Sequence, residues 1–109
     1  MDERDKALIE EFKRRLPPDL AGHLKRLVIF GSRARGGAPE DSDLDVIALV
    51  DIRTQAIEKG LEDVAYNVMW DHDFKPVISL KVFDESRFRG AVDSGYSFYR
   101  QVEKEGVSV

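Results

Sequence analysis

A short glycine-containing loop between two apolar segments is the feature that most constrains how this chain folds. Residues 27–30 are uniformly apolar and are followed at once by the loop Gly-Ser-Arg-Ala-Arg-Gly at residues 31–36. After a turn, Ser-Asp-Leu-Asp at residues 42–45 opens a second apolar segment that continues to residue 50. Short apolar runs bounded by turn residues predict buried strands. The sequence therefore places this loop between two strands of one sheet.

Two aspartates at the start of the second strand are the main candidates for chemistry. Because side chains alternate along a strand, Asp43 and Asp45 point to the same face, with their Cα atoms roughly 6.5 Å apart. That spacing allows both carboxylates to bind one divalent cation. The small residues Gly31 and Ser32 let the backbone approach a polyphosphate, and a short helix beginning there would aim its N–H groups at the anion. The pattern predicts a metal site beside a phosphate-binding loop.

The loop does not match the commoner phosphate-binding motifs. A Walker A loop needs Lys and then Ser or Thr after its second glycine, whereas Gly36 is followed by Gly37 and Ala38. A dinucleotide fingerprint needs three spaced glycines that open a long helix. Residues 28–50 instead resemble the active-site pattern of the DNA polymerase β-like nucleotidyltransferase superfamily. Within it, the loop and the Ser-Asp-Leu-Asp segment resemble those of the minimal nucleotidyltransferases.

This resemblance implies a nucleotidyltransferase site on the exposed face of the sheet, at the ends of the first two strands. Asp43 and Asp45 are then ligands of Mg²⁺ as well as the catalytic carboxylates. The β- and γ-phosphates of ATP or another nucleoside triphosphate lie on the backbone of Gly31 and Ser32 and on the Ser32 hydroxyl. An acceptor hydroxyl attacks the α-phosphorus, and pyrophosphate leaves.

Three further residues near the loop are candidates for nucleotide binding. Arg33 and Arg35 each offer a guanidinium to the triphosphate, and Arg33 is preferred because it lies nearer the apex of the loop. Ser42 either contacts the nucleotide or caps the turn before the second strand. Gly36 and Gly37 are interpreted as positive-φ positions of that turn.

Hydrophobic periodicity places the remaining elements around this motif. Apolar residues at helical spacing predict helices over residues 3–16 and 53–69, and a last helix from about residue 87 to the residue before Gly106. A third strand is expected over residues 76–83. This order predicts an α/β (α+β) fold in which helices pack on one face of a small mixed sheet and the other face is open for the site. Aromatic residues of the second and last helices are interpreted as core or partner-facing rather than base-stacking; they are Trp70, Tyr96, Phe98 and Tyr99.

The third strand lacks the carboxylate that active members of the superfamily commonly place beside the aspartate pair. Alternation directs Val77, Ser79 and Lys81 toward the site, and none is acidic. Asp73 reaches the site only if the strand begins early, and is otherwise a solvated loop residue. His72 is likewise a candidate base or a loop residue. We therefore expect catalysis that is slow, uses another base, or is absent.

Length and composition bound the rest. A chain of 109 residues with 42% apolar residues is expected to form one domain, residues 1–109, without a separate acceptor-binding domain. No apolar stretch reaches the ~18 residues of a membrane span, and the charged N-terminus shows no signal peptide. The absence of cysteine excludes disulfides and fits a reducing compartment as well as others, so a cytoplasmic location is the default expectation. A net charge of −4 argues against a surface dedicated to duplex nucleic acid.

The expected function is transfer of a nucleoside monophosphate, most simply AMP from ATP, to a hydroxyl of another macromolecule. Minimal nucleotidyltransferases are typically paired with a small helical HEPN-type protein, so the resemblance implies the antitoxin of a HEPN toxin–antitoxin pair. The absence of an acceptor-binding domain independently predicts a partner, and a homodimer stays open. One alternative is a catalytically weak or inactive subunit that binds nucleotide or a partner. A weaker alternative is a small-molecule nucleotidyltransferase acting on an antibiotic.

Overall fold

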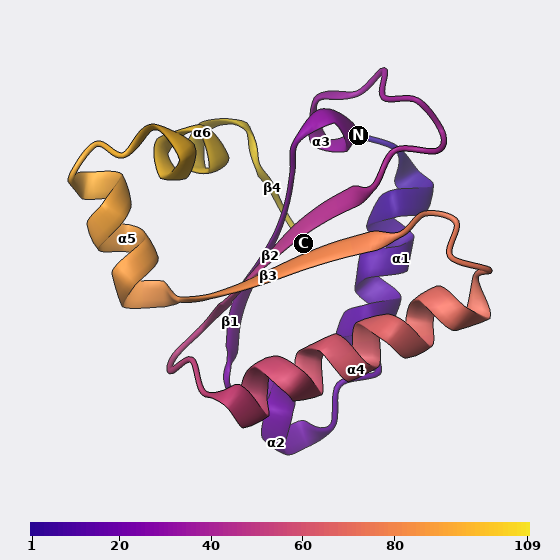
Figure 1. The fold of residues 1–109 in the computed structure, drawn as a ribbon, viewed down its shortest axis with the longest axis horizontal. Coiled ribbons are helices and arrows are strands. Elements are labelled where there is room, and N and C mark those ends of the chain that lie inside the picture. Colours follow the sequence, from indigo (N-terminus) through magenta and orange to yellow (C-terminus); the bar gives the residue numbers. More distant parts are fainter.

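A four-stranded mixed sheet forms the centre of the protein in the computed structural model, which describes residues 1–109 (Figure 1). The strands lie in the order β3-β2-β1-β4. Strand β1 (Leu24–Phe30) pairs antiparallel with β2 (Leu44–Val50) and with the short β4 (Val107–Ser108). Strand β3 (Ile78–Asp84) is parallel to β2 and forms the other edge. The predicted small mixed sheet is confirmed.

Six helices surround this sheet. The two longest, α1 and α4, lie close to the helices expected over residues 3–16 and 53–69. The helices are α1 (Glu3–Arg14), α2 (Pro18–Ala21), α3 (Ser32–Arg35), α4 (Gln55–Asp71), α5 (Glu85–Asp93) and α6 (Ser97–Glu105). Side-chain caps explain where the long helices begin. Asp2 accepts a hydrogen bond from the Arg4 N–H, and Thr54 accepts one from the Ile57 N–H at 3.1 Å. None of the helices combines the length and the apolar composition needed to cross a bilayer.

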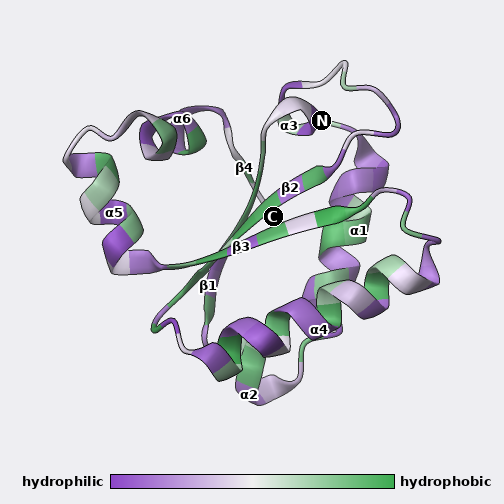
Figure 2. Ribbon diagram, in the orientation of Figure 1, coloured by the Kyte–Doolittle hydropathy of each residue, from purple (hydrophilic) through white to green (hydrophobic).

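The main core lies between one face of the sheet and helices α1 and α4. Every second residue of β2 is buried there, as the alternation predicted: Leu44, Val46, Ala48 and Val50. The helices contribute fully buried side chains that include Ile9, Phe12, Leu61 and Val68. Figure 2 shows the strands as largely hydrophobic, with hydrophilic residues on the helices. Burial of this apolar set is the main stabilising contribution to the fold.

A second, smaller cluster covers part of the opposite face of the sheet. It consists of Val28, Ile47, Leu49, Phe88 and Val102. The single C-terminal helix expected from the sequence is in fact two, because the chain turns between α5 and α6 at Gly95, where φ is +85°. The turn leaves Tyr96 63% exposed, so of the two predicted settings, core or partner-facing, a place in the core is excluded. The site face is therefore open only where α5 and α6 do not reach.

Candidate active site

The glycine loop and Asp45 lie against each other at one end of the sheet. Phe30, the last residue of β1, is paired with Asp45 of β2, so the chain leaves β1 beside this carboxylate. Gly31 has a φ of +78°, and a Cβ atom there would lie 2.7 Å from the Oδ2 of Asp45. Both the backbone conformation and the close carboxylate therefore require glycine. The structure brings together two of the residues that the sequence singled out.

The short helix α3 begins directly after Gly31, as expected. The N–H groups of Ala34 and Arg35 donate to the Gly31 carbonyl at 3.2 and 3.3 Å. The first N–H groups of a helix have no intrahelical acceptor, and here they belong to Ser32 and Arg33. Buried Ala34 anchors the turn to the core. The backbone can thus offer hydrogen-bond donors beside Asp45.

Electrostatics distinguish the two members of the aspartate pair, Asp43 and Asp45. Asp43 is exposed just before β2, whereas Asp45 is half-buried. Burial raises the pKa of Asp45, the positive charge of Lys81 lowers it, and the negative charge of Asp43 raises it again. The charge of Asp43 thus acts on Asp45, although burial is the larger cause of the raised pKa of Asp45. A cation placed there would relieve the cost of burying the Asp45 charge.

The neighbouring strand β3 presents no carboxylate to this environment. Ser79 is the register partner of Asp45, and Lys81 that of Ile47. Ile78 and Val82 lie in the main core, so alternation directs Ser79 and Lys81 to the site face, as predicted. No group of three or more His, Cys, Asp or Glu side chains in the chain is arranged to hold a metal.

The two residues considered as substitutes for the missing carboxylate lie elsewhere. The Nε2 of His72 is 3.1 Å from Glu11 Oε1 of α1, on the main-core side of the sheet. Asp73 is exposed in the turn after α4, with a φ of +57°. Both are therefore loop residues in this structure.

The side chain of Arg33 is nearly buried and is bonded to other parts of the protein. Its guanidinium donates to both carboxylate oxygens of Asp5 at 3.1 and 3.2 Å, and to the carbonyls of Ser42 at 2.9 Å and Glu40 at 2.6 Å. The side chains of Arg33 and Asp5 are only 10% and 6% exposed. These bonds hold the loop to α1 and to the start of β2. The sequence patterns did not predict this role of Asp5. The one feature that could have indicated it is a carboxylate close to the apolar stripe of the first helix.

Arg35 and Ser42 differ from Arg33 in their surroundings. The side chain of Arg35 is 52% exposed, and its NH1 lies 3.4 Å from Glu105 Oε2 of α6. The guanidinium of Arg33 is thus occupied by protein acceptors whereas that of Arg35 is more exposed, and contact of either with phosphate stays a prediction. The Ser42 hydroxyl donates to the Pro39 carbonyl at 2.8 Å, which matches its interpretation as a turn cap. Gly36 and Gly37 have positive φ angles of +88° and +71°, as expected for that turn.

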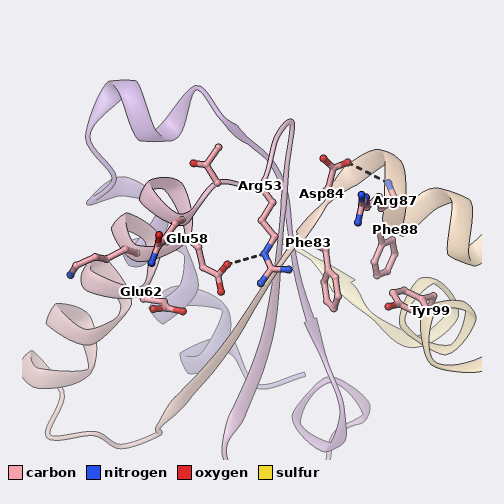
Figure 3. A pocket seen from close by; sticks show the side chains of 11 residues that line it. Arg53, Glu58, Glu62, Phe83, Asp84, Arg87, Phe88 and Tyr99 are labelled. Atoms are coloured by element: carbon pink, nitrogen blue, oxygen red, sulfur yellow. Dashed lines mark hydrogen bonds and ion pairs between the residues drawn. The ribbon is translucent and has the colours of Figure 1, made fainter.

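Two cavities lie at different ends of the sheet. A cavity of about 160 Å³ adjoins the loop and is lined by Gly31 together with residues of α6. A larger cavity, about 950 Å³, lies between α4 and α5 at the far end of β3, where Phe83 and Asp84 pair with the last residues of β2 (Figure 3). There Arg53 is paired with Glu58, and Asp84 accepts from the Arg87 N–H. The small cavity adjoins the loop residues Gly31 and Arg35, and a third cavity of about 780 Å³ on the α1 side is lined by Arg33 and His72.

Comparison with known proteins assigns this geometry to a family. Residues 5–105 match the model of the nucleotidyltransferase domain. The chain belongs to this nucleotidyltransferase family. The nucleotidyltransferase is similar to two proteins of Methanocaldococcus jannaschii, named "Putative protein adenylyltransferase MJ0141" and "Putative protein adenylyltransferase MJ0604". The first is 32% identical over 105 residues, which cover 94% of this chain and 95% of the relative.

The second relative is 30% identical over 98 residues, which cover 90% of each chain. No solved structure matches the nucleotidyltransferase. The domain and both relatives support nucleotidyl transfer as the class of reaction, and they span nearly the whole chain.

Proposed function

We propose that this nucleotidyltransferase transfers AMP from ATP, with Mg²⁺, to a hydroxyl of a partner protein. The observation that carries the proposal is the contact between Gly31 and Asp45, because it joins a phosphate-type loop to a carboxylate that can bind metal. Both relatives are named as protein adenylyltransferases, which supports ATP as the donor and a protein as the acceptor.

The aspartate pair suits Mg²⁺. This ion is usually bound by one or two carboxylates together with substrate phosphates and water, so two carboxylates suffice when a triphosphate is present. The half-buried Asp45 also gains from a cation, since burial raises its pKa and Lys81 offsets this only in part. When bound, Mg²⁺ would neutralise charge on the triphosphate and polarise its oxygens.

The residues of the chain have distinct parts in the proposed reaction. Gly31 leaves room for the Asp45 carboxylate beside the loop, Ser32 offers its hydroxyl and N–H to the triphosphate, and the exposed guanidinium of Arg35 adds positive charge. The acceptor oxygen forms a bond to the α-phosphorus while the bond to pyrophosphate breaks, and the acceptor proton is lost to solvent. Since no side chain is placed as a base, we expect slow turnover.

A partner-binding surface is available away from the aspartate pair. Tyr66, Trp70 and Phe74 pack on one another with ring centroids 5.5 to 6.4 Å apart. Tyr66 and Trp70 nevertheless remain 52% and 65% exposed. Exposed apolar patches of this kind mark protein interaction sites. We propose that this aromatic patch binds a helical HEPN-type protein, whose toxicity the nucleotidyltransferase controls as an antitoxin.

A second candidate function follows from the absence of a third carboxylate. The domain would then bind nucleotide and its partner with little or no transfer. The residues of the loop and the aspartate pair are the same in both candidates, so nucleotide binding alone does not separate them.

Labelling with ATP distinguishes the two. The protein is incubated with Mg²⁺, a HEPN-type partner and ATP labelled at either the α- or the γ-phosphate. AMP transfer predicts that only the α-label becomes attached to the partner, and that Asp45→Asn abolishes it. Tyr66→Ala with Trp70→Ala should abolish labelling while ATP binding persists. Binding without any labelling would favour the inactive subunit, and absence of nucleotide binding would contradict both candidates.

A further inference from the structure

The small cavity beside the loop has the features of a subsite for the nucleotide base. Gly31 lines this cavity and also contacts Asp45, so a ligand with its phosphates on the loop can extend into it. Its volume of about 160 Å³ is below the range of roughly 300–1,000 Å³ typical of pockets for whole drug-sized ligands. The cavity therefore suits a single ring system.

Two aromatic side chains form its apolar wall. Phe30 and Phe98 lie edge to face, with ring centroids 5.8 Å apart and an interplanar angle of 89°. Phe98 remains 40% exposed although α6 packs against β1, so part of this large apolar side chain stays free for contact with a ligand. Aromatic side chains bind bases by stacking, because every base has a π-face. Helical spacing alone predicts that Phe98 is a core or partner-facing residue, since only the fold brings it beside Gly31.

Polar side chains at the cavity define its chemistry. Glu105 Oε2 lies 3.4 Å from both the Arg35 guanidinium and the Gln101 amide nitrogen. Glu105 therefore joins the loop to α6 and holds the Gln101 side chain at the cavity. A glutamine amide can both donate and accept, which matches the amino group and ring nitrogen of adenine. On its N7 and O6 edge guanine presents two acceptors, which the Gln101 amide matches less well than it matches the donor and acceptor of adenine.

We propose that this cavity is the base subsite, that Phe98 stacks on the base and that Gln101 selects adenine over guanine. The inference rests on the proposed function and adds to it the residues that determine the choice of nucleotide. Under this proposal, the affinity for a nucleotide depends on its base as well as on its phosphates, whereas the loop and the aspartate pair involve only the phosphates.

Titration calorimetry with ATP, GTP and inorganic tripolyphosphate, each with Mg²⁺, tests this proposal. The unmodified protein should bind ATP more tightly than either GTP or tripolyphosphate. Phe98→Ala should weaken ATP binding about 10- to 100-fold and leave tripolyphosphate binding unchanged. Gln101→Leu should bring the affinities for ATP and GTP close together, again without effect on tripolyphosphate. Tyr96→Ala, an exposed aromatic residue outside the cavity, is the matched control and should change none of these values.

The possible results separate this inference from the proposed function. Equal affinities of the unmodified protein for ATP and tripolyphosphate would overturn the base subsite and leave the phosphate site intact. Equal losses of ATP and tripolyphosphate binding in Phe98→Ala would also overturn it, since Phe98 would then support only the fold. Failure of the unmodified protein to bind any of the three ligands would overturn both proposals.

Discussion

The two faces of strand β2 serve different purposes although they alternate along the same seven residues. One face is apolar throughout and is covered by α1 and α4 in a core of 17 buried residues. The other face carries Asp45 beside the loop, and farther along it Ile47 and Leu49 lie in a cluster of five buried residues. The comparison indicates that one face serves packing alone, while the other combines packing with a partly desolvated carboxylate beside the loop.

Arg33 and Arg35 show the same contrast two residues apart. We expect Arg33→Ala to destabilise the protein by about 3–5 kcal/mol, because it leaves buried Asp5 without its partner. Arg35→Ala removes only an exposed ion pair and should cost at most about 1 kcal/mol, while weakening ATP binding. Urea denaturation measures the first effect and calorimetry the second. Similar losses of stability in the two variants would contradict this division of roles.

Matched leucine truncations compare the two apolar clusters. Leu61→Ala in the main core and Leu49→Ala in the smaller cluster both remove a side chain that is at most 1% exposed. Leu→Ala substitutions at such positions cost about 2–5 kcal/mol. We expect Leu61→Ala near the top of that range and Leu49→Ala near the bottom, because the smaller cluster can collapse more readily around a cavity. Denaturation in urea checks the order, and the reverse order would count against it.

Two loop glycines separate backbone strain from crowding of Asp45. Gly31→Ala and Gly36→Ala both place a side chain at positive φ, which costs about 1–3 kcal/mol. Only at Gly31 does the new Cβ meet Asp45, whereas nothing lies within 4 Å at Gly36. We therefore expect both variants to lose stability but only Gly31→Ala to lose ATP binding. Loss of binding in both would mean that loop conformation alone matters.

The smallest expected effect is a gain of stability on removing the charge of Asp45. Burial raises the pKa of Asp45 in the folded protein, so ionisation destabilises the fold once the pH rises above its unfolded value of about 3.9. Asp45→Asn should therefore have a higher Tm than the unmodified protein at pH 7. The difference should shrink as the pH falls toward and below about 3.9, because the carboxyl then becomes protonated in the unfolded as well as the folded state. A lower Tm of the variant at pH 7 would contradict the inferred cost.

Local patterns predicted the sheet and the position of the aspartate pair. Alternation along β2 predicted that Asp45 lies on the face opposite the main core, and helical spacing predicted the positions of α1 and α4. Both predictions work because a regular strand or helix buries one apolar face, and that face recurs at a fixed spacing in the sequence. Ser79 and Lys81 fall on the site face for the same reason. The predicted roles of the aspartate pair and of Ser32 in binding remain predictions.

Contacts between distant segments could not be predicted in this way. Arg33 bonds to Asp5, 28 positions away, and no local pattern reports that pairing. The turn at Gly95 interrupts a helical spacing that otherwise continues, so α6 could not be separated from α5 by periodicity. Helix α6 brings Phe98 to the loop, so the cavity beside Gly31 could not be predicted without knowing that α6 is a separate helix.

We propose that the close approach of Gly31 and Asp45 forms a nucleotide site that depends on metal. This dependence can be measured by titrating ATP into the unmodified protein and into an Asp43→Asn, Asp45→Asn double variant, each with and without Mg²⁺. We predict binding only to the unmodified protein and only with Mg²⁺, while both proteins stay folded. Equal binding by the two proteins, or binding that is indifferent to Mg²⁺, would contradict the claim.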